Sequence, residues 1–112
     1  IVKMASADLG GAVADFDAAI ALDPNEPEAF LNKGIALLNQ NADSKAARAM
    51  LDAAIAKRTA KPELAYYMRG IANERIGDVR GAYEAYRQAV LLAPAWEEPR
   101  RELARFRIVR QS

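Results

Sequence analysis

The sequence predicts an all-α protein in which short antiparallel helix pairs stack as a small solenoid, and three observations carry this prediction. Helical periodicity runs almost from end to end, with turn residues at regular intervals. Twenty-five of the 112 residues are alanine, a strong helix former with a small side chain. Finally, one segment is repeated, since residues 77–94 (GDVRGAYEAYRQAVLLAP) resemble residues 7–24 (ADLGGAVADFDAAIALDP) position by position.

The breaks between periodic stretches define the elements in order. Each stretch is about 12–16 residues long, the usual length of a helix in a compact bundle, and the connections are a few residues long. After a short stub at 1–6, we therefore expect helices at 8–22, 27–40, 43–57, 63–76, 79–92 and 96–110.

Local residues support these boundaries. Asp8 and Asp78 stand where an N-cap carboxylate would begin a helix. Pro24 and Pro94 follow the second helix of a pair, where proline prevents continuation. Three further prolines lie near the starts of first helices, where a missing N–H does no harm, namely Pro27, Pro62 and Pro99.

Two patterns recur with a period near 35 residues. An aromatic-x3-Gly pattern occurs at Phe30–Gly34 and at Tyr66–Gly70. An Ala-x3-large-x2-Ala pattern occurs three times, with spacings of 34 and 36, and involves Ala12, Phe16, Ala19, then Ala46, Met50, Ala53, then Ala82, Tyr86, Ala89. The repeating unit is therefore a pair of helices, the first carrying the glycine and the second carrying the alanines.

The two helical glycines need a packing reason. Glycine inside a helix costs about 1 kcal/mol relative to alanine, so two at the same phase indicate close approach of a partner helix. We expect Ala12, Ala46 and Ala82 to be the small residues that face them. Phe16, Met50 and Tyr86 would then fill the space between the paired helices.

These residues resemble the tetratricopeptide repeat, whose pattern is aromatic-x2-Leu-Gly-x2-Tyr, then Ala-x3-Phe, then Pro. The resemblance covers essentially the whole chain and implies a right-handed solenoid. The sequence departs from the pattern where Lys33 and Arg69 replace Leu, where Asn73 replaces Tyr and where Arg58 replaces the terminal Pro. These departures affect local turn and contact geometry.

The resemblance divides the chain into units of one domain spanning 1–112. A partial first repeat occupies 1–24, and complete repeats occupy 27–60 and 63–96. The stretch 97–112 is expected to be a C-terminal capping helix, with Leu103 and Ala104 in the Leu-Gly phase.

In this family, the first helices line a concave face that binds a peptide or helix of a partner protein. The resemblance therefore implies a non-catalytic protein–protein interaction scaffold. The helical phase predicts a groove that is apolar in its middle and basic toward its C-terminal rim, formed by Leu31, Ile35, Leu38, Leu64, Tyr67, Ile71, Arg75, Arg101 and Arg105.

The family also contains a carboxylate clamp for charged C-terminal tails, and the sequence argues against it here. Asn32 matches the middle asparagine of that clamp, but Leu64 and Met68 stand where lysine and arginine are needed. We therefore expect an apolar peptide or amphipathic helix as the ligand.

Composition excludes several other functions. The chain has no histidine and no cysteine, which removes the commonest general base, the commonest metal ligand and any disulfide. We predict no enzyme activity, no cofactor and no metal site. The formal net charge of +1 and the lack of a long apolar run give no sign of nucleic-acid binding or of a membrane span.

An arginine-rich run near the C-terminus has two interpretations, a surface for an acidic partner or RNA and a solvated end helix. The second is favoured because acidic residues are interleaved at helical spacing, as in Glu97–Arg101 and Glu102–Arg105. Compartment is not determined, with cytoplasm and periplasm both compatible, and the Ala- and Arg-rich composition is typical of GC-rich bacteria.

Two further roles remain open at this point. The helix at 8–22 is preceded by a stub of a first helix, so the N-terminal end could serve for self-association as a homodimer or assembly module. Alternatively, the chain could be a regulatory segment of a larger enzyme. Because it starts at Ile1 rather than Met, we expect the natural N-terminus to lie upstream.

Overall fold

The computed structural model describes residues 13–41 and 43–111, with side chains as far as residue 106. Within these residues all regular secondary structure is helical. Residues 13–22 form the first described helix. It is followed by α2 (Pro27–Asn39), α3 (Ser44–Ala56), α4 (Pro62–Ile76), α5 (Val79–Leu92) and α6 (Glu97–Gln111).

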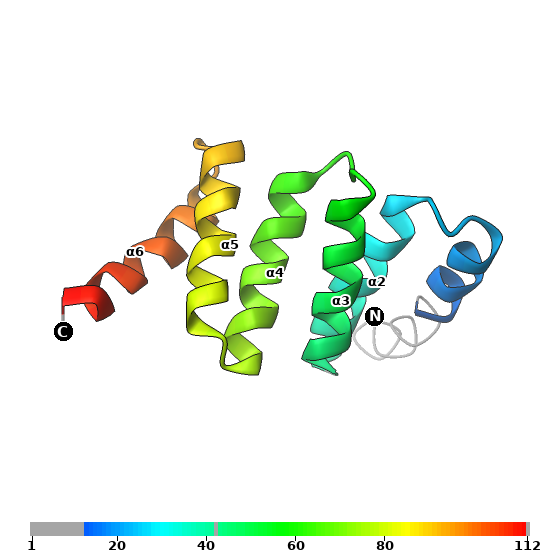
Figure 1. Ribbon diagram of the computed structural model, residues 1–112, viewed down its shortest axis with the longest axis horizontal. Coiled ribbons are helices and arrows are strands. Elements are labelled where there is room, and N and C mark those ends of the chain that lie inside the picture. Colours follow the sequence, from blue (N-terminus) through cyan, green and yellow to red (C-terminus); the bar gives the residue numbers. More distant parts are fainter. Residues whose placement is uncertain (1–12, 42, 112) are drawn as a thin grey trace, which may run out of the picture.

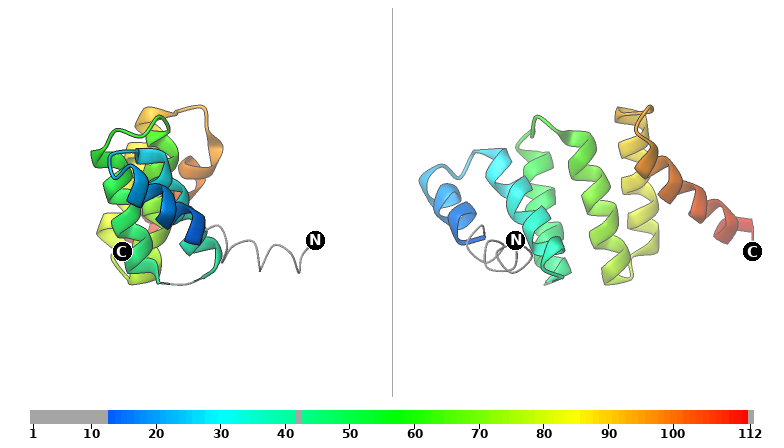
Figure 2. Two further views of the ribbon diagram at one scale, coloured as in Figure 1. Left: turned by 90° about the vertical axis from the view of Figure 1, so that its right-hand side faces the viewer. Right: turned by 180° about the vertical axis from the view of Figure 1, so that it is seen from behind.

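The helices follow one another along the long axis of the molecule, and each packs against the next in sequence (Figures 1 and 2). α2 also contacts α4, which belongs to the following pair. This consecutive packing of antiparallel helices confirms the predicted all-α repeat solenoid. The predicted boundaries hold within a residue for α2 to α6, while residues 8–12, including Asp8 and Ala12, lie outside the described part.

Helix starts are set by capping aspartates and by prolines, of which Asp78, Pro27 and Pro62 were predicted from the sequence. The Asp78 carboxylate accepts a hydrogen bond from Gly81 N at 2.9 Å and caps α5. Asp43 caps α3 in the same way, accepting from Lys45 N at 3.0 Å and Ala46 N at 3.1 Å. Pro27 and Pro62 are the first residues of α2 and α4, where the absent N–H would have had no intrahelical partner.

The two helical glycines let neighbouring helices approach closely, as predicted, but large side chains face them instead of the expected Ala46 and Ala82. A Cβ on Gly34 would lie 2.8 Å from Leu51 Cγ, and a Cβ on Gly70 would lie 2.5 Å from Tyr86 Cε1. Tyr86 and Leu51 are both 0% exposed. In each pair, therefore, the second helix places a large side chain directly over the glycine of the first.

The register of α3 differs by one residue from the prediction. The buried set is Ala47, Leu51 and Ala54, each 0% exposed, whereas Ala46, Met50 and Ala53 are partly exposed. The cause is that α3 contains the Ala-x3-large-x2-Ala pattern twice, one residue apart. The helix buries the copy that lies 35 residues from its counterpart on each side, so the spacing is uniform.

The same correction moves the terminal-proline position of the middle repeat from Arg58 to Thr59, which lies 35 residues from both Pro24 and Pro94. Thr59 is 6% exposed, and its backbone N–H donates to Ala54 O at 3.0 Å. Arg58 instead has a positive φ of 64° in the turn that ends α3.

Two departures from the repeat pattern are explained by ion pairs between successive pairs. Lys33 on α2 reaches Asp17 on the preceding helix at 2.6 Å, and Arg69 on α4 reaches Asp52 on α3 at 2.5 Å. Asp17 and Asp52 are 35 residues apart. Such partly exposed pairs contribute little stability, but their recurrence shows that successive helix pairs dock in the same way.

The third departure, Asn73, is also a contact between repeats. Its side chain is 1% exposed, and its Oδ1 accepts a hydrogen bond from Arg48 Nη1 on α3 at 3.0 Å. A buried amide without a partner would be costly. Arg48 supplies that partner and also lies 3.6 Å from Asp78.

Candidate partner-binding surface

The predicted groove residues come from α2, α4 and α6, the first helix of each pair, but two of them do not reach the surface. Leu31 is 2% exposed and Leu38 is 3% exposed. Both belong to the core cluster between α2, α3 and α4, together with Leu51, Ala65 and Ala72. The prediction that Leu31 and Leu38 line an exposed patch is therefore wrong, because α4 packs close enough to α2 to cover them.

Four apolar residues of the predicted groove keep part of their surface exposed. Ile35 and Ile71 pack against the core, so only part of each side chain is accessible. Leu64 is half-buried at the start of α4. Tyr67 lies one turn further along, with its ring 5.9 Å from that of Tyr86 and 4.9 Å from that of Trp96. Burial, followed by the nearby Glu102 carboxylate, raises the pKa of Tyr67.

Trp96 is the member of this surface that sequence reasoning missed. It lies in the turn before α6, where it closes a shallow pocket of about 310 Å³ with Lys61, Glu63, Leu64 and Ala93. Leu64 and Trp96 provide the apolar walls. The sequence did contain a signal for it, because the chain's one tryptophan stands two residues after Pro94. A large aromatic residue in a turn does not serve helix formation, so it indicates a contact.

The three arginines of the predicted rim have different surroundings. Arg75 Nη1 donates to the backbone oxygen of Leu38 at 2.8 Å, so it caps the C-terminal end of α2. Arg105 is held by Glu74 at 2.9 Å and also pairs with Glu102. Arg101 has a side chain 67% exposed, compared with 55% for Arg105, and makes a long contact of 3.6 Å to Glu98.

Glu74 joins α4 to both α5 and α6. Its Oε1 accepts a hydrogen bond from Tyr86 Oη at 2.6 Å, and both of its oxygens accept from Arg105 Nη2. Burial, together with the hydrogen bond to Glu74, raises the pKa of Tyr86 far above its usual value. The hydrogen bond to Glu74 also raises the pKa of Arg105. The network fixes the basic rim of the surface.

Glu28, at the start of α2, makes a second long-range connection that the sequence did not reveal. Its carboxylate accepts from Thr59 Oγ1 at 2.9 Å and from Ala60 N at 2.9 Å. These two residues precede α4, so the contact fixes the turn between the repeats. It also holds the Lys61 segment that borders the Trp96 pocket.

The described residues contain no group of His, Cys, Asp or Glu arranged to hold a metal ion. In the same part of the chain, no helix is both long and apolar enough to cross a bilayer. What the surface does offer is a pocket with apolar walls, a pair of tilted aromatic rings in contact, and an exposed arginine within neighbouring turns of α4 and α6.

No protein-family model matches the sequence, and the comparison with curated proteins gives no match either.

Proposed function

We propose that this chain is a non-catalytic interaction module of the tetratricopeptide type, which binds a peptide segment of a partner protein on the face made by α4 and α6. The observation that carries the proposal is the apolar pocket between Leu64 and Trp96, next to the exposed Tyr67 edge. Its volume of about 310 Å³ is at the low end for ligand pockets. This size suits one large apolar side chain of a peptide better than a complete small molecule.

Charge gives the ligand a second feature. Arg101 projects from α6 one helical turn beyond the tryptophan, and its contact to Glu98 is too long to be a strong hydrogen bond. A carboxylate on the peptide, placed a few residues from the apolar anchor, would find a charge-assisted partner there. The proposed ligand is therefore a short acidic segment with one large apolar residue.

Trp96 is the chain's one tryptophan, so the pocket contains its own fluorescent reporter. Random peptides displayed on phage can be selected on the wild-type chain and counterselected on Leu64→Glu. Selected peptides are then titrated while Trp96 emission is recorded. We expect a saturable change for the wild-type chain and at least a tenfold weaker affinity for Leu64→Glu.

The matched control is Leu91→Glu, which makes the same substitution on α5 at a leucine 64% exposed and outside this pocket. It should keep wild-type affinity. If no selected peptide alters Trp96 emission, or if Leu64→Glu and Leu91→Glu weaken binding equally, the proposed site is wrong.

A further inference from the structure

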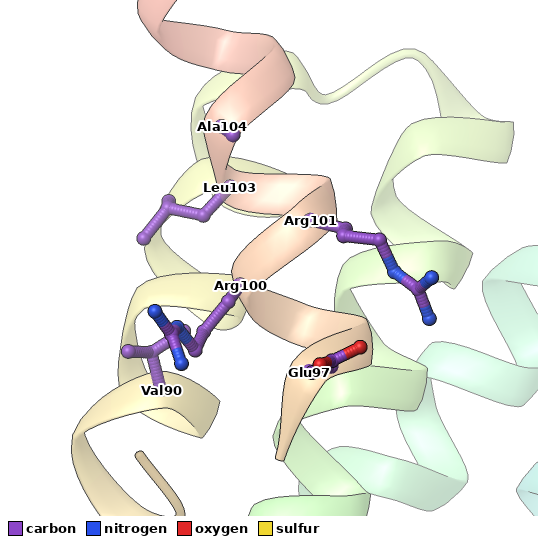
Figure 3. A pocket seen from close by; sticks show the side chains of 6 residues that line it. All are labelled: Val90, Glu97, Arg100, Arg101, Leu103 and Ala104. Carbon is purple, nitrogen blue, oxygen red and sulfur yellow. The ribbon is translucent and has the colours of Figure 1, made fainter. Parts of the chain in front are cut away.

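A second cavity lies on another part of the molecule, between the end of α5 and α6 (Figure 3). It is open and has a volume of about 580 Å³. Val90, Leu103 and Ala104 give it an apolar floor, and Glu97, Arg100 and Arg101 complete the lining. In Figure 3, Arg100 lies beside Val90 on one side of α6, whereas Arg101 points away on the other side.

The position of the cavity in the repeat shows what shape of ligand it would accept. Ala104 stands at the same position of the repeat as Gly34 and Gly70. Gly70 follows Gly34 by 36 residues, and Ala104 follows Gly70 by 34. In the two preceding pairs, that small residue is covered by a large side chain of the second helix, Leu51 or Tyr86. Ala104 is exposed, and no helix within the described residues covers it.

The helix at 13–22 has the complementary pattern. Phe16 and Ala19 lie 35 residues before Leu51 and Ala54 and therefore correspond to residues that are 0% exposed in α3. In contrast to their counterparts, Phe16 and Ala19 are only half-buried. This helix thus retains accessible surface on the face that a second helix uses to contact a first helix.

Charge also matches the two surfaces. No lysine or arginine occurs between Met4 and Asn32, a stretch that contains six acidic residues. Asp15 is exposed and stands in the phase of Ala85, which is 1% exposed in α5. On α6, acidic and basic residues alternate, but the cavity itself is lined by two arginines and one glutamate. An acidic helix is therefore favoured at this site.

We propose that the cavity receives the helix 13–22 of a second copy of this chain, with Phe16 placed over Ala104 and Asp15 beside Arg100. The two surfaces differ, so the contact is heterologous. Such contacts produce rings when the rotation closes and open chains of copies when it does not. Association would be strongest at low salt, because the charges involved are exposed.

Sedimentation velocity on the 112-residue chain tests the proposal with two variants that each disable one surface. Ala104→Glu places a longer, acidic side chain on the floor of the cavity. Asp15→Arg reverses the charge on the helix 13–22. Both residues are exposed, so the fold should persist, and far-UV circular dichroism checks this.

We expect the average mass of the wild-type chain to rise with concentration beyond that of a dimer, and to fall when NaCl is added. Each variant alone should remain near the monomer mass of 12.2 kDa. A mixture of the two should form a discrete 1:1 pair, since the intact helix of Ala104→Glu can enter the intact cavity of Asp15→Arg. Leu64→Glu should associate like the wild-type chain, because Leu64 lies outside the cavity.

Three results would overturn the proposal. A wild-type chain that is monomeric at every concentration excludes self-association and leaves the cavity to another protein. Unchanged association of Ala104→Glu excludes the cavity as the contact. Association that is lost in Asp15→Arg and not recovered in the mixture shows that copies pair through like surfaces at their N-terminal ends.

Discussion

Gly70 shows how one missing methyl group positions two helices. A Cβ at this residue would lie 2.5 Å and 2.6 Å from two ring carbons of Tyr86, and that ring is held by its hydrogen bond to Glu74. Alanine would gain about 1 kcal/mol of helix propensity, but overpacking a core costs about 1–3 kcal/mol. We therefore expect Gly70→Ala to lower the free energy of unfolding by up to about 2 kcal/mol, as measured by urea denaturation.

The control for this prediction changes the other partner. In a Tyr86→Leu background the shorter side chain removes the clash, so Gly70→Ala should be neutral or stabilising there. A strong coupling between the two substitutions is the expected sign of direct contact. If Gly70→Ala costs the same in both backgrounds, the close approach of the two helices is not its cause.

At the scale of helices, the boundaries could be predicted because they depend on residues in the immediate neighbourhood. Pro27, Pro62 and Asp78 act at the turn in which they stand, and the structure places them as expected. The rotation of a helix about its axis depends instead on contacts with other helices, so it could not be predicted from neighbouring residues. α3 offers two overlapping alanine patterns, and only contact with Gly34 determines that Leu51 rather than Met50 is buried.

The candidate site was predicted less completely for a related reason. Helical phase identifies which residues share a face, but not how far the next helix pair covers that face. Leu31 and Leu38 were therefore assigned to the surface although α4 buries them. Trp96 lies in a turn without helical periodicity, and its contact with Tyr67 depends on how α6 is placed.

Glu74 connects three helices, which leads to a prediction about pH. In Tyr86→Phe, one hydrogen bond to the carboxylate is lost while Arg105 remains in place. Near pH 8, this variant should be less stable than the wild-type chain by about 1 kcal/mol. Because the folded-state pKa of Tyr86 is raised above the usual tyrosine value of 10.0, the native state keeps a proton that the unfolded chain gives up above that pH.

The wild-type chain therefore loses stability as the pH rises past about 10. The phenylalanine variant has no hydroxyl at residue 86 and does not lose the stability that depends on its proton. The difference in free energy of unfolding should be largest below that pH and should narrow by about pH 11. The pKa of Tyr67 is also raised, but Tyr67 is present in both chains, so its contribution to the difference in stability largely cancels. Urea denaturation at both pH values measures the difference, and a gap that stays constant or widens contradicts the prediction.

For the whole molecule, the contacts between helices are almost all sequential, which is the property of a solenoid. The all-α class and the succession of helices from α2 to α6 could be derived from the sequence, since each pair repeats the same local pattern. The tilt of α6 could not be derived. At the α5–α6 contact, Leu103 replaces the basic residue found at Lys33 and Arg69, so the recurring ion pair is missing there.

α6 is consequently held by α5 through few residues, and one of them is Phe106, which is 7% exposed. Its ring packs on those of Tyr86 and Tyr83, with centroids 5.9 Å and 6.1 Å away. In a structure in which each helix contacts mainly its neighbours, a loss of packing in one helix need not destabilise distant helices. We expect Phe106→Ala to increase amide hydrogen exchange in α6 strongly, with a modest increase in α5.

Exchange in α2 and α3 should remain within about twofold of the wild-type rates, because their core cluster contains no residue of α6. Mass spectrometry of peptic fragments separates these helices. An equal loss of protection in all helices would show that the chain unfolds as one cooperative unit. In that case the proposed binding surface between α4 and α6 would be as rigid as the core, and a ligand could not act by ordering α6.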